Sequence, residues 1–266
     1  MKAFVFDLAK CNGCYGCQIA CKDEMCDNEW LPYSLPQPDL GQFWMKVTQE
    51  TAGQVPKVRV NYEPHMCNHC ADAPCMAAAP EAVYRREDGL VIIDPIKAQG
   101  NKALKDACPY GAIYYNDVLD VAQKCTGCAH LVDRGMLPHC VDLCGTYALR
   151  FGDVEEFGDE LKDAVQLTDA AHGGLVYYLN MPKLFIGGEV WDPAIDECLI
   201  GATIQLTCPD GNVLTTQTDG FGDFWFKKLD AGKYALDIVV PGYKPVHQDI
   251  DLVTSLNVGD FPLEQA

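Results

Sequence analysis

The stretch that decides the fold of the N-terminal half is Cys11-Asn-Gly-Cys14-Tyr-Gly-Cys17-Gln-Ile-Ala-Cys21. Its spacing, C-x2-C-x2-C-x3-C, is strongly diagnostic of a site for an iron-sulfur cluster. A compact loop lets the first three thiolates surround one 4Fe-4S cluster, while the fourth, at the start of a helix, points towards a second. The glycines between the cysteines allow the turns and bring backbone N–H groups close to sulfur.

A complementary motif follows much later in the chain. It reads Cys125-Thr-Gly-Cys128, then eleven residues, then Cys140-Val-Asp-Leu-Cys144, so an inserted loop delays its third cysteine. Two-cluster ferredoxins send the fourth ligand of each motif to the cluster of the other motif. Such crossed pairing predicts two 4Fe-4S clusters, one on Cys11, Cys14, Cys17 and Cys144, the other on Cys125, Cys128, Cys140 and Cys21.

A second pair of motifs is degenerate. Cys67-Asn-His-Cys70 is followed by Cys75, but the position of a fourth ligand reads Ala79, still followed by Pro80. Its counterpart keeps one cysteine, with Ala103 to Ala107 in place of further ligands. Crossed pairing then completes a third 4Fe-4S cluster, on Cys67, Cys70, Cys75 and Cys108. The ligands of a fourth cluster are missing from both motifs of the pair.

Two other chemistries fit these cysteines less well. Structural zinc sites pair two CxxC knuckles and do not combine three closely spaced ligands with a fourth sent elsewhere. Haem attachment needs CxxCH, whereas Ala71 and Ala129 follow the candidate pairs. The remaining candidates are expected to pack or to lie beside ligands rather than bind: His69 and His130 near the motifs, Cys26 as a buried free thiol, and Cys198 and Cys208 as structural residues.

Charge and hydropathy exclude several classes of function. The net charge of -18 argues against binding nucleic acid, and residues 151–266 hold 20 acidic against 6 basic residues. No apolar run approaches the roughly 20 residues that span a bilayer, so no transmembrane segment is expected. The first residues read as a strand leading into the cysteine motif, which leaves no room for a signal peptide. We expect a cytoplasmic protein, with export bound to a signal-bearing partner left open.

The other segments predict an α+β chain of two domains. Residues 81–94 read as two short strands around a turn at Asp88-Gly89, and residues 28–54 as a long irregular loop. Beyond Pro182, seven alternating segments separated by turn residues predict an all-β sandwich. The expected domains are 1–181, a duplicated ferredoxin-like domain with three clusters, and 182–266, the sandwich.

The cysteine order resembles that of the iron-sulfur subunits of dimethyl-sulfoxide-reductase-family molybdenum enzymes. The missing fourth cluster, the run Cys125 to Asp133 and the appended sandwich look most like the polyphenol transhydroxylases of that family, with catechol dehydroxylases as relatives. The C-terminal part, with Thr218-Asp-Gly-Phe-Gly-Asp-Phe224 and Ala231-Gly-Lys-Tyr234, resembles transthyretin-like or carboxypeptidase-regulatory-like sandwiches.

This resemblance implies an electron-transfer subunit without catalytic residues of its own. Its partner would be a larger catalytic subunit that alone holds molybdenum on molybdopterin guanine dinucleotide, and a soluble electron donor is a further candidate partner. No nucleophile-base pair or nucleotide loop in the sequence suggests an independent active site. Two alternatives stay open: electron delivery to a reductive catechol dehydroxylase or other molybdenum reductase, and a free-standing polyferredoxin.

Overall fold

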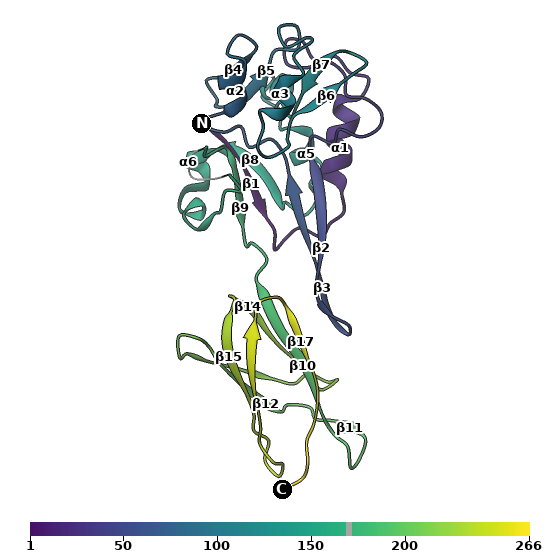
Figure 1. The fold of residues 1–266 in the computed structure, drawn as a ribbon, viewed down its shortest axis with the longest axis vertical. Helices are drawn as coiled ribbons and strands as arrows, with labels where there is room; N and C mark the ends of the chain where they lie inside the picture. The colour runs from purple at the N-terminus through teal and green to yellow at the C-terminus, as the bar shows by residue number, and fades with distance from the viewer. Residues whose placement is uncertain (169–171) are drawn as a thin grey trace. The chain divides into compact units, whose positions relative to one another are not determined.

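A computed structural model describes residues 1–168 and 172–266 (Figure 1). The chain divides into two compact units. The first unit comprises Met1–Gln49 and Tyr62–Met181, and the second comprises Glu50–Asn61 and Pro182–Ala266. Across the described residues, no helix combines the length and the apolar character that crossing a bilayer demands.

A three-stranded sheet lies at the centre of the first unit. Its middle strand, β1 (Lys2–Asp7), pairs antiparallel with β8 (Leu149–Asp153) and parallel with β9 (Val176–Leu179). Side chains alternate across a strand, so Phe4 and Phe6 enter the core shared with the cysteines, while alternate residues pack on the other face. Because both faces of β1 are covered, its sequence is apolar at almost every position.

Two short hairpins complete the β-structure that belongs entirely to the first unit. β4 (Val83–Arg85) pairs with β5 (Val91–Ile93), as predicted, and β6 (Tyr114–Asn116) pairs with β7 (Val121–Gln123). Their apolar side chains form one core with two short helices, α2 (Pro74–Ala78) and α3 (Ala103–Asp106).

Helices carry or adjoin several further motif cysteines. The longest of these, α1 (Gly16–Met25), carries Cys17 and Cys21 and packs against α5 (His139–Asp142). Cys128 immediately precedes α4 (Ala129–Val132). Further along the sequence, α6 (Val154–Phe157) and a 3-10 helix, η1 (Gly158–Asp163), follow β8.

A long hairpin corrects the expectation of an irregular loop over residues 28–54. β2 (Lys46–Gln54) and β3 (Lys57–His65) form a two-stranded sheet, so the C-terminal part of the expected loop is a strand. The end of this hairpin, Glu50–Asn61, belongs to the second unit.

The second unit contains two four-stranded sheets. One has the order β11-β10-β14 with β17 paired to β10, and the other has the order β13-β12-β15-β16. Apolar side chains from both sheets form one core, among them Ile186, Phe224, Leu206 and Leu236. The predicted α+β fold class is confirmed. The strands are β10 (Leu184–Asp192), β11 (Glu197–Cys198), β12 (Thr203–Thr207), β13 (Val213–Gln217), β14 (Asp223–Leu229), β15 (Gly232–Ile238), β16 (Val246–Leu252) and β17 (Leu256–Pro262).

Candidate metal centres

The first cysteine set, Cys11, Cys14, Cys17 and Cys144, joins the start of the chain to the residues that follow α5. Cys14 is exposed and the other three are half-buried. Burial, and then the nearby thiols of Cys11 and Cys144, raise the pKa of Cys17 to about 12, so these side chains lie close together. The backbone N–H of Leu149 donates to Cys144 Sγ at 3.3 Å.

The second set, Cys21, Cys125, Cys128 and Cys140, is buried throughout. Burial raises the pKa of Cys140 well above its usual value, and the thiols of Cys128, Cys21 and Cys125 add to that rise. The backbone N–H of Gly127 donates to Cys125 Sγ at 3.3 Å. Gly127 has φ +64°, and a Cβ there would lie 2.6 Å from the side chain of Leu90, so this loop conformation requires glycine.

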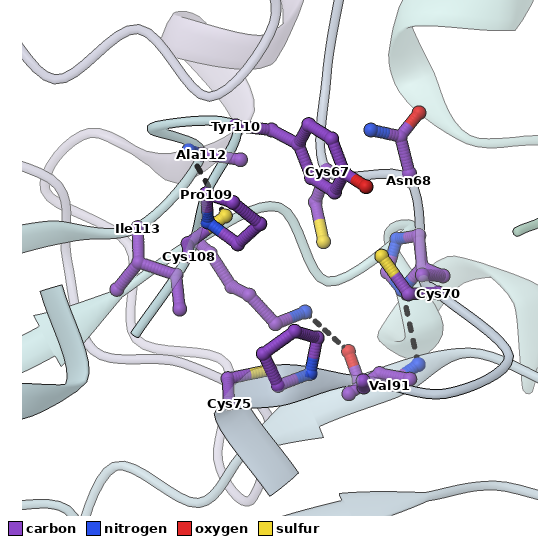
Figure 2. A pocket seen from close by; sticks show the side chains of 14 residues that line it. Cys67, Asn68, Cys70, Cys75, Val91, Cys108, Pro109, Tyr110, Ala112 and Ile113 are labelled. Carbon is purple, nitrogen blue, oxygen red and sulfur yellow. Dashed lines mark hydrogen bonds between the residues drawn. The ribbon is translucent and has the colours of Figure 1, made fainter. Parts of the chain in front are cut away.

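The third set, Cys67, Cys70, Cys75 and Cys108, surrounds a cavity of about 360 Å³, a volume that includes the open solvent at its mouth. Figure 2 shows the four thiols arranged around this cavity. Burial, followed by the thiols of Cys67, Cys108 and Cys75, raises the pKa of Cys70 to about 12. The backbone N–H of Ala112 donates to Cys108 Sγ at 3.4 Å (Figure 2).

The three sets adjoin one another in order. The pKa of Cys140 is raised first by burial and then by the thiols of its own set. Cys17, a member of the first set, is also close enough to raise it. Cys125 is similarly affected by Cys67: burial first, then this thiol of the third set, raise its pKa to about 11. The second set therefore lies between the first and the third.

The donors fit iron-sulfur clusters better than single metal ions. Each set offers only thiols, which soft metals and iron-sulfur clusters prefer. A tetrahedral zinc ion holds its sulfurs about 2.3 Å from the metal and therefore close to one another. Within residues 1–168 and 172–266, only Cys26, Asp27 and Asp39 bring three ligand atoms of His, Cys, Asp or Glu within 4.8 Å of one another, so no three motif thiols are that close. The wider spacing of the twelve motif thiols suits a larger group, and the binding of a cluster by each set stays a prediction.

Apolar side chains are packed at the sequence positions where ligands of a fourth cluster would be expected. Ala79 and Leu104 have no exposed surface, and both belong to the core built from α2, α3 and the two short hairpins. A cluster there would need both the missing thiols and the space that these side chains occupy. Packing therefore agrees with the matched loss of ligands in the sequence.

Two histidines lie beside motif cysteines without being part of any set. His69 is completely buried, and its Nδ1 accepts the backbone N–H of Val91 at 3.0 Å. Burial, and then the charge of Lys124, hold the pKa of His69 well below its usual value. His130 lies 2.9 Å from a carboxylate oxygen of Glu24 and stacks on Trp30, with ring centroids 4.1 Å apart.

The cysteines outside the sets behave partly as expected. Cys26 is not the buried thiol that the sequence predicts: it is half-buried, and its Sγ lies 3.4 Å from Asp39 Oδ1. Cys26 follows the last residue of α1 and has an extended backbone, so it does not continue the buried face of the helix. Cys198 and Cys208 are free, half-buried thiols in the second unit.

Sequence reasoning missed Lys124, which is 3% exposed and lines the cavity of the third set. Its Nζ donates to the carbonyl oxygens of Val91 and Cys125. Lysine is ordinarily a surface residue, and its position next to Cys125 was the only signal in the sequence.

Comparisons with known proteins agree with this arrangement. The family described as "4Fe-4S dicluster domain" matches residues 58–154, which include eight of the twelve motif cysteines, and "Carboxypeptidase regulatory-like domain" matches residues 186–263. The protein is 37% identical to the pyrogallol hydroxytransferase small subunit of Pelobacter acidigallici, over 90% of each sequence.

Components of two reductases are also similar. A subunit of the tetrathionate reductase of Salmonella typhimurium is 30% identical over 69% of this protein and 74% of its own length. A component of the anaerobic dimethyl sulfoxide reductase of Escherichia coli is 34% identical over 58% of this protein and 74% of its own length. The cysteine sets and these similarities together lead to one conclusion: this protein belongs to the family of iron-sulfur electron-transfer subunits of molybdopterin oxidoreductases.

Proposed function

We propose that the protein holds three 4Fe-4S clusters, one on each cysteine set, and passes electrons along them. A bound 4Fe-4S cluster exchanges one electron at a time with little structural change. The observation that supports this most strongly is that each set joins cysteines from two distant segments. Thiols so gathered repel one another as thiolates, and cluster iron supplies the positive charge that compensates them.

The order of the sets supports a linear path. The second set adjoins the first through Cys140 and Cys17, and the third through Cys125 and Cys67. The exposed Cys14 makes the first set the most accessible to another protein, whereas the second set is enclosed. The residues of this protein hold and insulate the path, and we assign none of them a catalytic role.

We propose a larger catalytic subunit as the partner, with molybdenum on molybdopterin guanine dinucleotide in that subunit alone and a polyphenol as its substrate. The 37% identity to a pyrogallol hydroxytransferase small subunit supports this substrate class. A second candidate is electron delivery to a reductive molybdenum enzyme, such as a catechol dehydroxylase. The similarity to a component of tetrathionate reductase favours a reductive partner of this kind. In either case a soluble electron donor is a further candidate partner, and we place the complex in the cytoplasm.

We further propose two domains: a duplicated ferredoxin-like domain at 1–181, from which the hairpin end Glu50–Asn61 departs to join the second compact unit, and a transthyretin-like sandwich at 182–266. The two four-stranded sheets with a shared core support the sandwich. The two short hairpins support the duplication, because both share a core with short helices near motif cysteines: α2, which carries Cys75, and α3, which ends two residues before Cys108.

Purification of the tagged protein from its native cells, without oxygen, tests the partnership. We expect a larger subunit to co-elute together with molybdenum. A protein that elutes alone at about 29 kDa and without molybdenum would instead support a free-standing carrier of the polyferredoxin type. Assays of the complex with a polyphenol, alone and with a reductant, then separate the two candidate reactions, because hydroxyl transfer consumes no electrons overall and dehydroxylation does.

A further inference from the structure

Lys124 is a buried cation between two cysteine sets. Its side chain lines the cavity of the third set, and its backbone adjoins Cys125 of the second set. Both hydrogen bonds recorded for Nζ end on backbone carbonyls, those of Val91 and Cys125 (Figure 2 shows the first). These bonds hold the ammonium group in place but carry no compensating charge.

The negative charge that Lys124 would face is that of a bound cluster and its thiolate ligands, because the four cysteines of the third set line the same cavity. Among the described residues, no carboxylate lies within ion-pair distance of its Nζ, although a buried charge ordinarily needs an opposite partner. The four cysteines of the third set line the same cavity as Lys124, and Nζ of Lys124 also donates to the carbonyl oxygen of Cys125, a member of the second set. The ammonium group therefore lies beside the third set and next to a residue of the second.

His69 adds a second polar group to the wall of the same cavity. Because its Nδ1 accepts the N–H of Val91, the ring proton of the neutral side chain lies on Nε2. That Nε2 is buried and has no hydrogen-bond partner among the described residues. A buried N–H without a partner is costly, and a sulfur atom of a bound cluster is an acceptor of the right kind.

We propose that Lys124, assisted by His69, raises the reduction potential of the cluster that the third cysteine set would hold. The proposal rests on the proposed function, because it requires a cluster in that cavity. One-electron reduction adds one negative charge to the site. A buried cation favours the reduced form strongly, since little solvent screens the interaction. Cys14 of the first set is exposed, so solvent screens charges near that set. The reduction potential of the first set therefore serves as an internal reference for that of the third.

The test is an EPR-monitored redox titration of the complete, cluster-loaded protein and its variants. Loss of a signal in Cys108→Ala identifies the third set. In Lys124→Gln the amide still donates to a carbonyl but the charge is gone, and we expect reduction of the third set to become at least about tenfold less favourable. For a one-electron couple that is a shift of about 59 mV to lower potential. Lys124→Arg should keep the potential near its original value, and His69→Phe should lower it by less than Lys124→Gln.

Controls separate this inference from the proposed function. Lys97→Gln removes a lysine whose side chain is 62% exposed and should leave all three potentials unchanged. If the unmodified protein lacks three clusters, the proposed function fails. If it has three and the third potential is the same in Lys124→Gln, only the role of Lys124 is overturned. Loss of iron from the third set in both Lys124→Gln and Lys124→Met, with retention in Lys124→Arg, would assign the lysine to cluster retention and would equally overturn the inference.

Discussion

The thiol of Cys140, in α5, lies close to that of Cys21, in α1, and both are buried in the first unit. The two helices pack together, so the second set depends on contact between the start of the chain and a segment far along it. Each cluster in our proposal therefore also links distant parts of the fold. Metal binding and the stability of the first unit should be coupled for this reason.

Replacement of Cys21 by serine should remove the second cluster and leave the other two. A hard hydroxyl binds iron poorly in a buried thiolate site, so we expect a loss of about four iron atoms per protein molecule. Cys26→Ser, just beyond the end of the same helix, is the matched control and should keep all the iron. Iron analysis and EPR of the reduced proteins measure both effects, and equal iron in the two variants would contradict the ligand assignment.

Restoring one thiol should not restore a fourth cluster. Ala79→Cys supplies a ligand at the expected position, but Leu104 occupies the neighbouring core and the other ligands are missing. We expect unchanged iron content and a less stable protein, because a larger side chain at a completely buried position costs about 1–3 kcal/mol. A gain of about four iron atoms would show that the site survives in the fold.

Local patterns account for what the sequence predicted. The spacing of the cysteines reflects short loops. The alternation of apolar and polar residues over 81–94 and 184–262 is visible within single strands. These features need no knowledge of distant packing. The cysteine order, which is also local, was enough to identify the family.

What the sequence did not reveal depends on distant contacts. β2 and β3 were missed because their exposed and half-buried positions do not alternate regularly, so no period of two marks them. The burial of Lys124 follows from the carbonyl oxygens of Val91 and Cys125, and the first of these lies in another hairpin. The position of Cys26 depends on where α1 ends and on Asp39 in the following loop.

The ion pair between Lys57, on β3, and Asp223, on β14, should stabilise the second unit. The side chain of Lys57 is only 5% exposed, so Asp223→Ala leaves a buried ammonium group without its partner. We expect a loss of about 3 kcal/mol, as is usual when one member of a buried pair is removed. Asp230→Ala breaks the exposed pair with Lys183 and should cost less than about 1 kcal/mol.

Denaturant unfolding followed by tryptophan fluorescence, to which Trp191 on β10 and Trp225 on β14 contribute from the second unit, measures both changes. Similar stabilities for the two variants would show that Lys57 is solvated when Asp223 is absent.

A side chain in place of Gly188, on β10, should destabilise the second unit. A Cβ there would lie 2.7 Å from the ring of Phe224 and 2.9 Å from Val258, and both belong to or pack against the core of the second unit. We expect Gly188→Ala to lower the free energy of unfolding by about 1–3 kcal/mol, because the packed ring must move. Gly220→Ala, with no atom within 4 Å of the added methyl group, should be close to neutral. Equal unfolding midpoints in thermal denaturation would contradict the close approach at Gly188.

Metal and sulfide analysis of the anaerobically purified, full-length protein shows whether twelve cysteines hold three 4Fe-4S clusters. We expect about 12 iron atoms and about 12 acid-labile sulfides per protein molecule, four of each per cluster, with negligible zinc. About eight iron atoms, or zinc in place of iron without labile sulfide, would contradict this expectation.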